Sequence, residues 1–267
     1  MNIGINIRVM GPQSSRDTIS SLLTQAESIG IESAWMVDHI AIPPDDAEGS
    51  GGRYLDPITT LAWMAAQSST IKIGTSVLIL PYRPKLPTAK SIATIQELSG
   101  NRLLLGVGIG WMDPEFKALG VDRHQRGKIS DETLQFFHDC FSKDVVELNG
   151  QPFLFKPQPP RPPIYIGGGP PHAIDRALKY GDGWLPMGSL DKIRDDIREY
   201  RERSEAELGK PGEVVTFSSI EGLGVAEAED RLKAYEEAGV TRVVLGQKYE
   251  TADDWQPAFA VLQQIQK

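Results

Sequence analysis

The pair Asp38-His39 is the strongest candidate for chemistry in this chain, because it follows directly on the strand predicted over residues 33–37. A histidine can move a proton near neutral pH or donate a hydrogen bond. Asp38 could fix the tautomer of that histidine or bind a heteroatom of a ligand ring. The alternative interpretation is a structural Asp-His pair that holds the loop.

A second candidate is the run Gly167-Gly168-Gly169-Pro170, which lies between a predicted strand and a predicted helix. Glycines let backbone amides approach an anion, and the amino end of a helix adds a favourable dipole. The run therefore predicts a phosphate cradle, with a plain tight turn as the alternative. Trp184, next to the following strand, either packs inside the protein or forms a wall for a ligand.

The other histidines have weaker cases. His124 precedes a helix together with two arginines and is expected to line the mouth of the site, whereas His138 lies in the middle of a helix and is expected to pack or face solvent. The sequence has no HExxH, no CxxC and no histidine pair at helical spacing, so no metal site is predicted. It also lacks a GxSxG motif, and its GVGIG segment does not fit a dinucleotide-binding fingerprint.

These candidates must be positioned by short β-rich runs that alternate with amphipathic helical segments. Strands are predicted over residues 3–9, 33–37, 71–78, 102–106, 163–167, 183–186, 214–220 and 242–246. Strands that alternate with helices predict a parallel sheet, and eight such units in 267 residues favour a closed (β/α)8 TIM barrel. Active sites of such barrels lie at the carboxyl ends of the strands.

We therefore expect one TIM-barrel domain over residues 1–267, with an irregular, proline-rich insertion near residues 143–162. The insertion is interpreted as an extended connector or a small hairpin. Two other segments carry the residues that are typical of helix starts. Asp56-Pro57 is expected to open a helix, and Thr251 with Asp254 to cap the last one.

Composition limits the class of partner. The net charge is −8 and no stretch is densely basic, so nucleic acid and anionic membranes are not expected as partners. No apolar run approaches the ~18 residues of a membrane span. Cys140 is the only cysteine, so no intrachain disulfide can form, and the chain starts without a leader-like segment. We expect a soluble cytoplasmic protein that binds small molecules.

Several motifs in a fixed order resemble the bacterial luciferase-like monooxygenase superfamily, and more narrowly its branch that depends on coenzyme F420, a 5-deazaflavin. The matching segments are AESIGIESAWMVDHIAIP, IKIGTSVLILPYRPKLPTAKSIATIQELSGNRLLLGVGIGW, the helix around SDETLQFF, PPIYIGGG and RALKYGDGWLP. They cover roughly residues 2–186, and the final third matches only in its general pattern. Because members are often homodimers, the resemblance also implies a homodimer.

The resemblance implies a barrel in which the cofactor ring lies across the strand ends beside Asp38 and His39, with His39 assisting hydride transfer. It implies a non-prolyl cis peptide at Ser76–Val77 and a cofactor phosphate on the glycine run. The residues predicted to bind the cofactor are Asp38, Ser76, Val77, Ile79, Gly108, Gly167, Gly168, Gly169, Pro170 and Trp184.

One departure concerns the substrate. In the sugar-phosphate dehydrogenase branch an acidic proton donor follows the GVGxG motif, but here that position is Trp111 and the nearest acids are Asp113 and Glu115. We therefore expect a less polar substrate in a pocket that includes Trp111 and His124. The cations that could meet the anionic oligoglutamate tail of F420 are Arg53, Arg83, Lys85 and Arg126, with ordinary solvated surface charges as the alternative.

The main hypothesis is an oxidoreductase that exchanges a hydride between ring carbon C5 of F420 and a small organic substrate. The alternative is an FMN-dependent luciferase-like monooxygenase, in which reduced FMN reacts with oxygen. A flavin-binding protein without catalytic activity is a third hypothesis, because a fold alone does not imply a function. The segment 41–54, rich in glycine, proline and acids, is interpreted as a mobile lid or a disordered surface loop.

Overall fold

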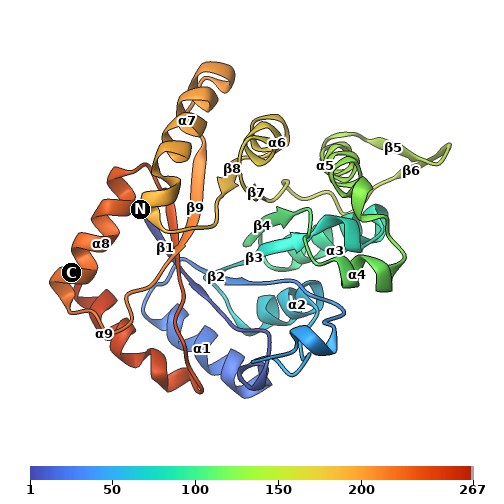
Figure 1. The fold of residues 1–267 in the computed structure, drawn as a ribbon. Coiled ribbons are helices and arrows are strands. Elements are labelled where there is room, and N and C mark those ends of the chain that lie inside the picture. Colours follow the sequence, from blue (N-terminus) through green and yellow to red (C-terminus); the bar gives the residue numbers. More distant parts are fainter. Residues whose placement is uncertain (266–267) are drawn as a thin grey trace.

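The computed structural model describes residues 1–265, in which eight parallel strands close into a barrel (Figure 1). The barrel strands are β1 (Asn2–Asn6), β2 (Ser33–Met36), β3 (Lys72–Ile79), β4 (Leu103–Gly108), β7 (Ile164–Gly167), β8 (Gly183–Leu185), β9 (Glu213–Ser218) and β10 (Arg242–Leu245). Their order around the barrel is their order in the chain, and β10 pairs with β1. The predicted (β/α)8 barrel is confirmed.

The helices surround the barrel and connect its strands (Figure 1). They are α1 (Arg16–Ser28), α2 (Pro57–Gln67), α3 (Lys85–Leu98), α4 (Asp113–Leu119), α5 (Arg126–Ser142), α6 (His172–Tyr180), α7 (Leu190–Leu208), α8 (Val225–Glu237) and α9 (Gln256–Ile265). No helix within residues 1–265 is long and apolar enough to cross a membrane.

Caps explain where several helices begin. The Asp56 carboxylate accepts a hydrogen bond from the backbone N–H of Thr59 at 2.8 Å, and Pro57 occupies the first turn of α2, as expected. The Thr251–Asp254 capping pair is also present, where it opens the short 3₁₀ helix Ala252–Trp255 that leads into α9. Helix α4 was not predicted, although Pro114 in its first turn and Gly120 at its end, with φ 67°, are ordinary boundary signals.

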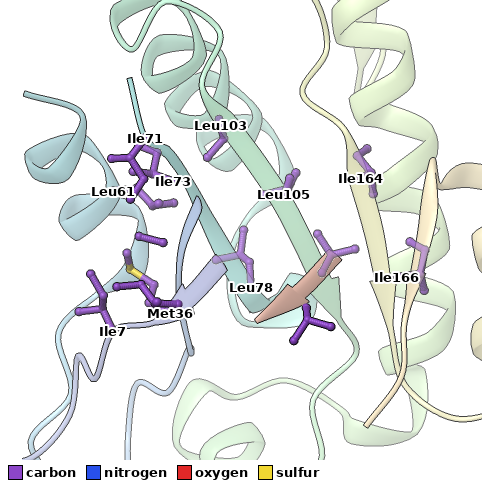
Figure 2. Close-up of a cluster of buried hydrophobic side chains, with 14 of the residues drawn as sticks. Ile7, Met36, Leu61, Ile71, Ile73, Leu78, Leu103, Leu105, Ile164 and Ile166 are labelled. Carbon is purple, nitrogen blue, oxygen red and sulfur yellow. The ribbon is translucent and has the colours of Figure 1, made fainter. Parts of the chain in front are cut away.

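The apolar core has two parts, as alternation along each strand requires. On β2, Ala34 and Met36 belong to the large layer between strands and helices, whereas Trp35 belongs to a smaller cluster with Leu104 and Tyr165. Figure 2 shows part of the outer layer, where side chains of β3, β4 and β7 follow one another. The smaller cluster fills the interior, so the barrel is packed below its carboxyl-end mouth.

The insertion near residues 143–162 contains a hairpin. Strands β5 (Val145–Leu148) and β6 (Gln151–Leu154) pair antiparallel and lie outside the barrel beside α5 (Figure 1). Asn149 and Gly150 turn the chain with φ values of 55° and 75°, the conformation that two-residue hairpin loops prefer. This confirms the interpretation as a small hairpin.

Candidate active site

A pocket of about 460 Å³ opens at the carboxyl ends of β2, β3, β4, β7 and β8. Parallel strands deliver their carboxyl ends to one face, so segments far apart in the sequence meet there. The predicted site residues that line the pocket are Asp38, His39, Ser76, Val77, Ile79, Gly108, Trp111, Gly167 and Gly168. The structure brings these residues together in one pocket. Their roles in binding and catalysis stay predictions.

The floor of the pocket is built by an irregularity in β3. The Ser76–Val77 peptide is cis, as the resemblance implied, and the register of β3 with β4 shifts between Thr75 and Leu78. The Val77 side chain then lies against two glycines of neighbouring strands. A Cβ on Gly108 would stand 2.5 Å from Val77 Cγ2, and one on Gly167 would stand 2.7 Å from Val77 Cγ1. Glycine is required at both positions for this floor to form.

His39 is held by a carboxylate that sequence reasoning did not assign to it. Its Nδ1 lies 2.8 Å from Oε2 of Glu115 on α4, and the His39 side chain keeps 17% of its surface exposed while that of Glu115 keeps none. The contact joins residues 76 positions apart in the chain. No local sequence pattern indicates it, because it depends on how α4 folds back over the end of β2.

Glu115 accepts three further hydrogen bonds. Its Oε1 accepts the backbone N–H groups of Ile40 and Ala41 at 2.6 and 2.9 Å, and its Oε2 accepts the hydroxyl of Tyr82 at 2.8 Å. Burial opposes ionisation of this carboxyl, but these donors together with His39 outweigh it and lower the pKa of Glu115. A carboxylate accepts only, so His39 Nδ1 carries the hydrogen and Nε2 is the free ring nitrogen.

Two aromatic rings flank His39. The Tyr54 ring centroid lies 5.0 Å from that of His39 and the Trp111 centroid lies 6.3 Å away, both edge to face. Trp111 lines the pocket but is 63% exposed, as expected for a residue at the mouth. These rings limit how the imidazole can turn and shield it from water.

Asp38 lines the pocket but does not orient His39. Its two carboxylate oxygens accept hydrogen bonds from both terminal nitrogens of the Arg83 guanidinium. One of them also accepts the backbone N–H of Ile79 at 2.8 Å. Burial raises the pKa of Asp38, and the hydrogen bonds and charge of Arg83 act against that rise. The expectation that Asp38 fixes the tautomer is therefore wrong, because its acceptor sites face Arg83. Contact with a cofactor ring stays a prediction.

Two cations predicted to meet a cofactor tail have other partners. Arg83 is only 12% exposed and bridges Asp38 and Asp56. Arg53 donates to the Ser14 hydroxyl at 2.8 Å and to the Ser14 carbonyl. Neither guanidinium faces the pocket, so that expectation is wrong for both.

The glycine run forms the pocket wall at the end of β7. Gly167 and Gly168 line it, whereas Gly169 and Pro170 lie beyond its lining. Trp184 is 1% exposed and donates its indole N–H to the Gly168 carbonyl at 2.9 Å. Trp184 thus packs inside the protein and supports the glycine loop through this hydrogen bond, and it does not form a wall of the pocket. A phosphate on this loop stays a prediction.

A larger cleft of about 970 Å³ adjoins the pocket, and Ile109 lines both. Its cationic and histidine residues are Lys85, His124, Arg126, Lys128, His172 and Arg176. His124 therefore lies in this cleft, apart from the pocket that contains His39. The remaining histidine, His138, bonds the Tyr180 carbonyl at 2.9 Å and serves in packing, as expected. Residues 1–265 contain no group of three or more His, Cys, Asp and Glu side chains that could hold a metal.

Comparison with known proteins identifies the family. The family model described as luciferase-like monooxygenase matches residues 3–266. The chain belongs to the luciferase-like monooxygenase family. An uncharacterized Mycobacterium tuberculosis protein is 29% identical over 260 residues, which cover 88% of each chain.

Two solved structures share the fold of this chain. An F420-dependent secondary alcohol dehydrogenase in complex with an F420–acetone adduct matches with a TM-score of 0.80 at 16% identity, covering 99% of this chain and 97% of the other. The oxygenating constituent of 3,6-diketocamphane monooxygenase from Pseudomonas putida, in complex with FMN, matches with a TM-score of 0.77 at 15% identity, covering 100% and 97%. At these identities the similarity establishes the fold of a luciferase-like barrel. It does not assign a cofactor.

Proposed function

We propose that this protein is an oxidoreductase that uses coenzyme F420 to exchange a hydride with a small organic substrate. The observation that carries the proposal is the pocket in which His39, oriented by Glu115, stands over an apolar floor of Val77. A flat aromatic ring requires an even apolar surface, and proton transfer requires a fixed basic or acidic group beside it. The pocket combines the two.

The adjoining cleft favours F420 over FMN. The deazaflavin carries an oligoglutamate tail with several carboxylates, whereas FMN ends at its phosphate. Lys85, Arg126 and Lys128 line the cleft and make no ion pair within residues 1–265. The acids of the cleft are partly neutralised. Asp131 pairs with Arg176 at 2.6 Å, and Asp139 pairs with Lys143, which does not line the cleft. The three unpaired cations would hold the tail, and Gly167 and Gly168 the phosphate nearest the ring.

The chemistry of the chain's own residues follows from the tautomer of His39. When bound, the deazaflavin supplies a carbon that accepts or donates a hydride. Oxidation of an alcohol releases a hydride from carbon and a proton from oxygen. Because the Nδ1–H group of His39 donates its hydrogen bond to Glu115, the lone pair of His39 Nε2 is available to accept that hydroxyl proton, and the reverse reaction returns it. Tyr54 and Trp111 keep water from competing for the imidazole.

The experiment that tests this proposal is a titration of purified protein with oxidised F420 and, separately, with FMN, followed by fluorescence. We expect F420 to bind at least tenfold more tightly. The variant Arg126→Met should weaken F420 binding and leave FMN binding unchanged, since only F420 reaches along the cleft. Tighter binding of FMN would refute the F420 assignment.

The second candidate is an FMN-dependent monooxygenase. The likeness to the FMN complex of 3,6-diketocamphane monooxygenase favours it, and the same floor over Gly108 and Gly167 would accept the FMN ring. Oxygen consumption that depends on reduced FMN and organic substrate would support this candidate. The homodimer stays a prediction, which light scattering of the purified protein checks.

A further inference from the structure

A guanidinium without an acidic partner stands beside the proposed active site. Arg8 follows β1, its Nε is buried without a hydrogen-bond partner, and it makes no ion pair within residues 1–265. The Arg8 side chain is half-buried, and a buried N–H group without a partner costs free energy. The Nε–H group of Arg8 therefore remains available to donate a hydrogen bond to a bound ligand.

The direction of the Arg8 side chain follows from its neighbours. Ile7 and Val9 are 1% and 0% exposed and pack in the layer between strands and helices. Side chains alternate along extended backbone, so Arg8 points to the other side, into the mouth of the barrel. Its backbone N–H is fixed by the Tyr249 hydroxyl at 2.7 Å.

The strand register brings Arg8 next to the pocket. Asn6 pairs with Trp35 of β2, and the Ile7 N–H continues the ladder to the Trp35 carbonyl at 2.8 Å. Two residues further in this register, Arg8 lies beside Val37, which lines the pocket that contains His39. Neighbouring strands are about 4.8 Å apart, well within the reach of an arginine side chain.

A second polar group on the same side of β1 also lacks a partner. Asn6 lies two residues before Arg8, and its Oδ1 is buried without a hydrogen bond. On the adjacent strand end stands Gly246, where an added Cβ would be 4.0 Å from the Asn6 Cβ. Buried polar groups without partners are rare in folded proteins, and here two lie together at the mouth.

Another arginine of the same barrel, Arg242, is buried and does have an acidic partner. Arg242 is 3% exposed at the opposite end of the barrel, where it binds Glu32 through two 2.9 Å contacts and the Tyr165 hydroxyl. Within the described residues 1–265, Arg8 makes no ion pair of this kind. The difference indicates that the partner of Arg8 arrives from outside the chain.

We propose that Arg8 forms the anion subsite of the substrate pocket, and that the substrate is a small organic carboxylate. The proposal rests on the proposed function, because the pocket beside Arg8 is the one assigned to the cofactor ring and His39. A guanidinium binds a carboxylate through two parallel N–H groups, whereas Asn6 Oδ1 is an acceptor and would take a hydroxyl or another donor of the same ligand. The apolar remainder of the substrate lies against Trp111 and Met187 at the rim.

The test is calorimetric titration of the F420-saturated protein with butanoate, hexanoate and benzoate, each compared with its amide. We expect at least one carboxylate to bind tenfold or more tightly than its amide, and Arg8→Met to abolish that preference. Arg8→Lys should restore part of it, because it keeps the charge without the fork. Lys248→Met, which removes an exposed cation at the end of the neighbouring strand, serves as the matched control and should keep the preference.

The outcomes separate this proposal from the proposed function. Failure of F420 to bind the wild-type protein refutes the proposed function alone, and the carboxylate titrations are then run on the protein without cofactor. Equal affinity for every carboxylate and its amide, or an undiminished preference in Arg8→Met with a native melting temperature, overturns the carboxylate subsite. If Arg8→Met does not fold, Arg8→Gln and Arg8→Lys provide the same comparison.

Discussion

The substitution Glu115→Gln tests the orientation of His39 most directly. An amide has one acceptor and one donor end, while Glu115 accepts from the backbone on Oε1 and from His39 and Tyr82 on Oε2. If the amide oxygen keeps the backbone donors, its NH₂ group faces His39 Nδ1. The imidazole must then accept there and carry its hydrogen on Nε2, which inverts the role of Nε2 in the pocket.

Two magnitudes follow from this geometry. General-base catalysis contributes roughly 10²–10⁴-fold, so kcat should fall by about that factor while cofactor affinity stays within about threefold. A hydrogen bond to a charged group is worth about 1 kcal/mol more than one to a neutral group. Glu115 accepts four bonds, so the variant should lose about 4 kcal/mol of unfolding free energy. For a chain of this size that corresponds to a melting temperature roughly 10 °C lower.

The assay is ¹⁵N NMR of histidine-labelled protein, in which the two ring nitrogens report the tautomer. The chain has only four histidines, and the signals of His39 are assigned by their loss in His39→Gln. Glu115→Asp is the control, because it keeps the charge and should keep the hydrogen on Nδ1. The same tautomer in wild type and Glu115→Gln would refute the reasoning.

Three further predictions concern the floor, the base of the barrel and the histidine itself. Gly108→Ala should displace Val77 and weaken cofactor binding at least tenfold, with recovery in a double variant that also carries Val77→Ala, as measured by titration. Burial acts to raise the pKa of Glu32, but hydrogen bonds and charge from Arg242 outweigh it and lower that pKa to about 2. The ionised Glu32 therefore adds to the free energy of unfolding, and urea unfolding should show this contribution complete above about pH 4.5 and lost as the pH falls toward 2. The variant Glu32→Gln should not show this loss. His39→Ala should bind cofactor normally but lower kcat about 10²-fold in steady-state assays, and an unchanged kcat would remove His39 from the mechanism.

The fold could be predicted because its signals are local. Each barrel strand and most helices were marked by periodicity, caps or glycine stops, and eight alternating units in one chain leave few architectures. The pocket residues at the strand ends could be placed for the same reason, since a barrel gathers strand ends on one face. Val77 and Gly108 needed the family resemblance, because spacing alone does not reveal a cis peptide.

The contacts between loops could not be predicted, because they join distant segments. Glu115 was considered only as an acid near Trp111, and its link to His39 depends on the packing of α4. Asp38 was assigned to its sequence neighbour, whereas its charged partner is Arg83, 45 residues away. Arg8 did leave a signal, because a cation between Ile7 and Val9 in a predicted strand must point away from the apolar face.

The segment that follows His39 is attached at both ends, and this has a consequence for how such a protein can diversify. Glu115 holds residues 40 and 41, while Tyr54 pairs with Met10 and the Leu55 N–H bonds the Val9 carbonyl. Between these anchors, residues 44–46 are exposed. Replacements there can reshape access to the pocket without moving the imidazole, so selectivity and proton chemistry are free to change separately during evolution.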